Sequence, residues 1–181
     1  GILSSISQSA VAFFGVYYKL QTFIYMPTSG IVQGMRPLMS YNYGAKLKER
    51  MHQILKVSGL VIAAILGAGT LLFFIVPNVL LSLFNASSGM LEIGETGLRI
   101  LSLSFIVSSF GVLMSGVFEA LGLGKYSLIV SLLRQLLITV PLAYILLNIM
   151  GIEGIWLSFV IAEAIASIVA YILYHKKFKT I

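Results

Sequence analysis

Ionisable side chains stand inside long apolar stretches of this sequence, where a charge is costly: Arg36, Glu119, Arg134 and Glu163. An arginine at the centre of a membrane-spanning helix costs about 2.5–3.5 kcal/mol on insertion scales, so it indicates an ion pair, a polar cavity or an ion pathway. At a rise of ~1.5 Å per residue, Arg134 and Glu163 fall at the same depth on successive apolar stretches. We expect them to pair or to face one polar cavity, either locking two helices together or taking part in substrate or proton movement.

The other two charges stand nearer the ends of their apolar stretches. Arg36 lies one to two turns from a basic loop, and its guanidinium can extend to the membrane interface. Glu119 lies close to a second basic loop, where it can pair with Arg36 or with Lys125. For these two residues we favour a structural role over a part in transport.

The first apolar stretch also carries uncharged polar residues and prolines. Gln33 and Asn42 give it a polar side, which can line a path or bond the backbone groups freed by Pro37. Pro27 and Pro37 each remove a backbone hydrogen bond, so we expect both to bend the helix that contains them.

The side chains of soluble enzymes are scarce. The sequence has no cysteine and no aspartate, and its two histidines, His52 and His175, stand far apart beside basic loops. Neither a hydrolytic triad nor a metal site is expected from this set. The run Gly122-Leu-Gly-Lys125 lacks the spacing and the Ser or Thr of a phosphate-binding loop. We therefore predict no enzymatic activity, no cofactor and no metal.

Composition places the chain in a lipid bilayer. Of its 181 residues 59% are hydrophobic and 10% are charged, against about 25% charged in soluble domains, and the mean hydropathy is +1.01. The net charge of +6 does not point to nucleic acid, because most basic residues cluster between or after apolar stretches. Those residues are Lys46, Lys48, Arg50, Lys56, Lys125, Lys176, Lys177 and Lys179. This pattern predicts cytoplasmic loops and a cytoplasmic C-terminus.

The hydropathy pattern predicts an all-α integral membrane fold, a bundle of about five transmembrane helices. The spans are expected at about 10–43, 54–76, 97–121, 126–148 and 155–174. Residues 1–9 are expected to end a helix that begins outside this sequence, or to form an outer loop, and the chain is expected to be a fragment. Tyr17, Tyr18 and Trp156 suit the headgroup level of the membrane. Small residues in the third span favour close helix packing: Ser104, Ser108, Ser109, Gly111 and Ser115.

Four stretches resemble one known family. They are Gln33-Gly-Met-Arg-Pro-Leu-Met-Ser-Tyr-Asn-Tyr-Gly-Ala-Lys46, Glu119-Ala-Leu-Gly-Leu-Gly-Lys-Tyr-Ser127, Ser131-Leu-Leu-Arg-Gln135, and Gly151-Ile-Glu-Gly-Ile-Trp156 followed by Ala162-Glu163. Together they are similar to the C-terminal half of multidrug and toxic compound extrusion (MATE) transporters.

That resemblance implies a secondary antiporter of two six-helix bundles in the plasma membrane. It would export organic, often cationic, compounds in exchange for H⁺ or Na⁺ by alternating access, with the N-terminal bundle as the partner of this chain. The family's coupling carboxylates lie largely outside this half or in the middle of the third span, where Glu119 is the one acidic residue and stands near the inner end. The resemblance therefore assigns no cation site to this half. The family often has a neutral polar residue at the position of Arg36, so the charge of the preferred substrate stays open.

Two alternatives stay open at this point. A lipid-linked saccharide flippase of similar architecture would need a strongly cationic cavity, for which Arg36 and Arg134 are candidates. A non-transporting membrane scaffold subunit is the alternative from a different class of protein.

Overall fold

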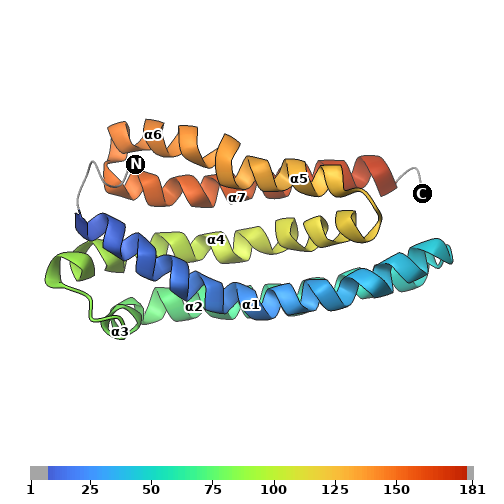
Figure 1. The fold of residues 1–181 in the computed structure, drawn as a ribbon, viewed down its shortest axis with the longest axis horizontal. Coiled ribbons are helices and arrows are strands. Elements are labelled where there is room, and N and C mark those ends of the chain that lie inside the picture. Colours follow the sequence, from blue (N-terminus) through green and yellow to red (C-terminus); the bar gives the residue numbers. More distant parts are fainter. Residues whose placement is uncertain (1–7, 179–181) are drawn as a thin grey trace.

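The structure, a computed structural model, describes residues 8–178, which form one bundle of helices and contain no strand (Figure 1). The long helices are α1 (Gln8–Gly44), α2 (Lys48–Ile75), α4 (Ser88–Ala120) and α7 (Ile152–Phe178), with the short α3 (Pro77–Ser82) after α2. Between α4 and α7 the chain forms α5 (Gly124–Leu132), the π-helical segment η2 (Leu133–Leu137) and α6 (Thr139–Met150). The predicted all-α membrane fold is confirmed. Of the predicted N-terminal segment 1–9, Gln8 and Ser9 begin α1 and the rest lies outside the described residues.

Four helical stretches of the described chain are long and apolar enough to cross a membrane: Lys48–Ile75, Ser88–Ala120, Gly124–Met150 and Ile152–Lys177. They contain most of the spans predicted at about 54–76, 97–121, 126–148 and 155–174. The helix α1 is not in this group, because tyrosine, glutamine, serine and threonine recur along it. Its crossing of the membrane at about 10–43, and with it the five-span organisation, stays a prediction.

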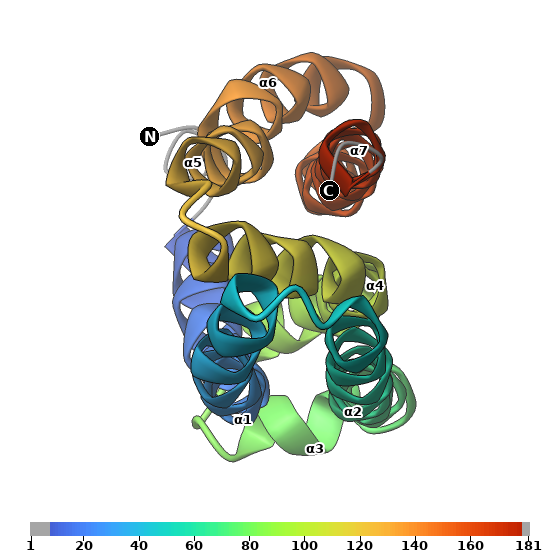
Figure 2. The same ribbon diagram turned by 90° about the vertical axis from the view of Figure 1, so that its right-hand side faces the viewer.

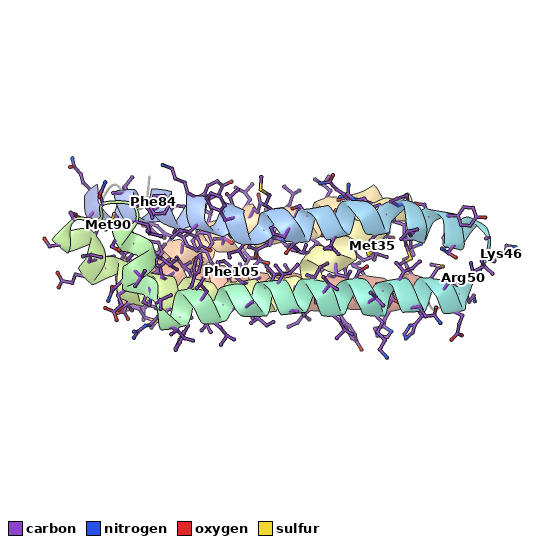
Figure 3. All side chains as sticks on the ribbon, turned by 90° about the horizontal axis from the view of Figure 1, so that it is seen from below. Met35, Lys46, Arg50, Phe84, Met90 and Phe105 are labelled. Atoms are coloured by element: carbon purple, nitrogen blue, oxygen red, sulfur yellow. The ribbon has the colours of Figure 1, made fainter. Side chains whose placement is uncertain are left out.

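Helix α4 lies at the centre of the bundle. In Figure 2, α1 and α2 lie on one side of it and α5, α6 and α7 lie on the other. Phe105 of α4 packs its ring edge-on against Phe73, at 5.1 Å between ring centroids, and against Tyr25, at 5.8 Å. Figure 3 shows Phe105 and Met35 between the α1 and α2 ribbons. Aromatic packing around α4 therefore holds this side of the bundle together.

Small residues of α4 allow its neighbours to approach closely. A Cβ atom at Gly116 would lie 2.5 Å from Val32 Cγ1 of α1, and one at Gly111 would lie 3.2 Å from Ser167 Oγ of α7. The Ser167 hydroxyl donates to the carbonyl of Val107 at 2.9 Å. The close approach at Gly111 confirms the prediction for that position of the small-residue face.

Two aromatic residues expected at the headgroup level belong to the core of the bundle. Tyr17 is 1% exposed and stacks on Phe105 at 6.4 Å between centroids. Trp156 is fully buried and meets Phe13 edge-on at 5.1 Å. Phe13 and Phe105 cover these rings, so Tyr17 and Trp156 face neighbouring helices, and their depth at the headgroup level stays a prediction. Tyr18, by contrast, is exposed.

The basic clusters gather at one end of the bundle. The α1–α2 loop, the α4–α5 turn and the last turn of α7 lie at the same end in Figures 1 and 2. Figure 3 places Lys46 and Arg50 at this end and Phe84 and Met90 at the opposite one. We call it the basic end. Gly122, at a φ of 72°, closes its α4–α5 turn in a backbone conformation that favours glycine.

Candidate functional site

A cavity of about 520 Å³ lies between α1, η2 and α7. We call it the aromatic cavity, because four aromatic rings and a methionine line it together with polar and charged groups. Its lining residues are Phe14, Tyr18, Gln21, Thr22, Tyr25, Met26, Ser29, Arg134, Gln135, Phe159 and Glu163. Its volume lies within the ~300–1,000 Å³ typical of small-molecule sites.

The aromatic cavity contains the predicted ion pair. Arg134 Nε lies 3.1 Å from Glu163 Oε1, and the two side chains are 16% and 12% exposed. The expected pairing is confirmed. Both residues also line one cavity, although aromatic and apolar side chains make up much of its wall, and their role in transport stays a prediction. Neither Arg134 Nε nor Glu163 Oε2 has a hydrogen-bond partner. The contact is thus Coulombic, and the second carboxylate oxygen remains available to a donor.

A π-helical turn positions Arg134. In η2 the Ile138 N–H donates to the Leu133 carbonyl five residues earlier, at 3.1 Å. Pro141 follows closely and has no N–H to continue the helical pattern, while the Thr139 hydroxyl donates to the Arg134 carbonyl at 2.5 Å. Single π-helical turns inside α-helices occur often at functional sites. This turn was not predicted from the sequence.

A second cavity of about 350 Å³ lies between α1, α4, α5 and η2, further along α1 toward the basic end. We call it the polar cavity, since hydroxyl, amide and charged groups make up most of its lining. Its lining residues are Ser29, Val32, Gln33, Arg36, Val112, Ser115, Gly116, Glu119, Ser131, Arg134 and Gln135. Ser29, Arg134 and Gln135 line both cavities, so the two spaces adjoin at these residues.

A second ion pair lines the polar cavity toward the basic end. Arg36 of α1 pairs with Glu119 of α4, and their side chains are 41% and 37% exposed. The Ser127 hydroxyl of α5 donates to Glu119 Oε1 at 2.7 Å. Lys125, the alternative partner of Glu119, instead lies over the Tyr126 ring, 5.3 Å from its centroid. Glu119 therefore joins three helices at this point.

The uncharged candidates on α1 differ in their positions. Gln33 lines the polar cavity. Asn42 lines neither cavity, because it is buried near the end of α1 and its Nδ2 donates to the Leu38 carbonyl at 2.8 Å. Pro27 and Pro37 both lie inside α1, which Figure 1 shows bent along its length. That these two prolines cause the bend stays a prediction.

Aromatic side chains of α1 that line the cavity were not among the site residues predicted from the sequence. Phe14, Tyr18, Tyr25 and Ser29 recur at four- and seven-residue intervals, which place them on one face of the helix. That spacing was visible in the sequence, but it is equally typical of an ordinary packing face. Tyr25 also joins α1 to α4, since its Oη lies 2.6 Å from Ser108 Oγ.

Within residues 8–178, no three histidine, aspartate or glutamate side chains lie close enough together to hold a metal ion. The described site therefore consists of two adjoining cavities and two ion pairs, Arg134–Glu163 and Arg36–Glu119.

Comparison with known proteins identifies the family. The MatE family model matches residues 1–145 of the chain. The chain belongs to the MatE family. This membership confirms the resemblance to MATE transporters that the sequence motifs carry.

Curated relatives carry the name multidrug export protein MepA. The one from Staphylococcus saprophyticus is 26% identical over 171 residues, which are 94% of this chain and 38% of that protein. The one from Staphylococcus aureus strain N315 is 26% identical over 164 residues, 91% of this chain and 36% of that protein. The chain therefore spans less than two fifths of the length of these relatives.

Solved MATE transporters share the fold. An outward-facing multidrug resistance MATE family transporter of the MOP superfamily superimposes with a TM-score of 0.91 at 21% identity, over 98% of this chain and 40% of that one. The bent form of the Vibrio cholerae MATE transporter VcmN gives 0.90 at 21% identity, over 98% and 41%. The MatE chain is thus an all-α half of a transporter fold, as predicted.

Proposed function

We propose that this chain is one half of a secondary antiporter that exports amphiphilic, cationic drugs and toxic compounds. The observation that carries the proposal is the aromatic cavity of a MatE family member, with a carboxylate set deep in an apolar bundle. Multidrug export is also the activity in the names of its curated relatives. The function is transport, not catalysis.

The lining of the aromatic cavity suits an amphiphilic cation. The faces of Phe14, Tyr25 and Phe159 attract a positive charge within ~6 Å of a ring centroid and also provide apolar contact area. Glu163 supplies a full negative charge with one carboxylate oxygen unpartnered. In a membrane interior these forces act with little competition from water.

Export requires a second bundle and a driving gradient. We infer that the N-terminal bundle forms the opposite wall of the site and that the two bundles rock between outward and inward openings. The sequence holds no phosphate-binding motif for ATP, so we expect an H⁺ or Na⁺ gradient to drive the cycle. We expect the membrane to be the plasma membrane. The positive-inside rule supports a cytoplasmic position for the basic end and for the end of α7.

A saccharide flippase is less well supported by the same geometry. Such a protein would need unpaired positive charge in its cavity to hold pyrophosphate. In the described cavities Arg134 is paired with Glu163, and Arg36 is paired with Glu119. The charges that line the two cavities therefore cancel, which leaves no unpaired positive charge for a polyanionic lipid. A scaffold subunit without transport activity would have no need for these cavities.

The test uses the complete transporter that contains this chain, expressed in cells that lack their main drug exporters. We expect these cells to accumulate less ethidium. Collapsing the proton gradient and the sodium gradient in turn should show that one of the two is needed for this effect. Glu163→Gln should lose export, while the matched control Arg99→Gln, which changes an exposed pair with Glu95, should retain it. The absence of gradient-dependent export of any lipophilic cation would refute the proposal.

A further inference from the structure

Arg134 lines both cavities and occupies the one carboxylate of the aromatic cavity. We propose that Arg134 is a tethered cation, which a substrate cation must displace from Glu163 in order to bind. This inference rests on the proposed export function and adds to it a residue that determines specificity.

The geometry of the pair suits displacement. Arginine and carboxylate bind most tightly when two parallel N–H···O bonds form between them. Here Nε lies 3.1 Å from Glu163 Oε1, and Nε makes no directed hydrogen bond. Glu163 Oε2 has no partner. The pair therefore neutralises the Glu163 carboxylate without the two parallel hydrogen bonds of the tightest arginine–carboxylate pairs.

Arg134 also has a second place for its side chain. The polar cavity, which it already lines, offers oxygen acceptors in the Gln33 amide, the Ser115 hydroxyl and the Glu119 carboxylate. The Ser115 hydroxyl is buried without a hydrogen-bond partner. A guanidinium released from Glu163 can thus turn toward the basic end and still find acceptors, while the aromatic cavity gains a free carboxylate.

A tethered competitor affects ligands according to their charge. A group held by a short tether competes at an effective concentration in the millimolar range or above, so it weakens the binding of every cation that needs Glu163. A neutral ligand of similar shape does not use the carboxylate and gains nothing when the competitor is removed. Arg134 therefore determines how well a cation binds relative to a neutral ligand. Its removal should change the ratio of these two affinities more than the affinity for the neutral ligand.

The experiment measures binding of tetraphenylphosphonium and of the neutral triphenylphosphine oxide to the complete, purified transporter by isothermal titration calorimetry. Arg134→Gln should bind tetraphenylphosphonium at least roughly tenfold more tightly than wild type, a change of about 1.4 kcal/mol, with the neutral probe unchanged. Arg134→Lys keeps the competing charge and should resemble wild type. Arg99→Gln is the matched control, since it removes an arginine that lines neither cavity.

The outcomes separate the two proposals. Unchanged or weaker binding of tetraphenylphosphonium to Arg134→Gln overturns the tethered cation, even where wild type binds and exports cations. No cation binding by either protein overturns the export function itself. Arg134→Gln leaves Glu163 without its counterion, so tetraphenylphosphonium should raise its melting temperature more than that of wild type. Arg134→Met, which keeps the aliphatic volume, serves as the second variant. If neither variant folds even with the cation present, the proposal fails.

Discussion

Breaking the Arg134–Glu163 pair tests how the bundle tolerates charge in its apolar interior. Removal of one partner of a buried pair costs about 3–5 kcal/mol, because the other charge stays buried without a counterion. Here the side chains are 16% and 12% exposed and border a cavity, which places the cost at the lower end. We expect Glu163→Gln to lower the free energy of unfolding by about 3 kcal/mol, and Arg134→Gln to act similarly.

A double-mutant cycle separates this pairing from general damage. The variant with both Glu163→Gln and Arg134→Gln carries no unpaired charge, so it should be less destabilised than the sum of the single changes, by about 0.5–3 kcal/mol. The assay is unfolding by titration with dodecyl sulfate in mixed micelles, followed by tryptophan fluorescence. Arg99→Gln, in a half-exposed pair, should change stability by at most about 1 kcal/mol. Additivity within about 0.3–0.5 kcal/mol would refute the reasoning.

Three further predictions use the same unfolding assay. Gly116→Ala should lower the free energy of unfolding by about 1–3 kcal/mol, since its Cβ would lie 2.5 Å from Val32. Gly30→Ala, with open space around it, should instead raise the free energy of unfolding by about 0.5–1 kcal/mol. Equal effects of the two changes would contradict the packing of α4 on α1. Glu119→Gln should lower the free energy of unfolding by only about 0.2–1 kcal/mol, because its pair with Arg36 is half exposed. A loss of stability as large as that of Glu163→Gln would contradict this weak contribution. Gly122→Ala, at a φ of 72°, should cost about 1–2 kcal/mol, whereas Gly124→Ala, which meets no neighbour, is the control.

The sequence predicted the ion pair because two simple constraints fix it. A charge inside an apolar span needs a partner, and the constant rise of a helix gives the depth of each residue. Arg134 and Glu163 share a depth on successive spans, and they pair in the structure. The same reasoning left Glu119 with two possible partners, because depth alone does not say which way a side chain turns.

Other features depend on tertiary contacts that no local pattern contains. Tyr17 and Trp156 have the residue types of a membrane interface, but rings from neighbouring helices bury them. The π-helical turn at η2 depends on a balance of hydrogen bonds around Arg134 and Thr139. The aromatic cavity forms only when α1, η2 and α7 meet. The sequence thus supplied the charged residues of the site, and the fold supplied its aromatic walls.

The most direct test of the export function is transport by the complete transporter purified into proteoliposomes. With an imposed inward gradient of H⁺ or Na⁺, wild type and Arg99→Gln should move ethidium outward at similar rates. Glu163→Gln should fold, elute as one species and fail to transport, because the aromatic cavity then holds no negative charge. Transport by Glu163→Gln at the wild-type rate would contradict the account.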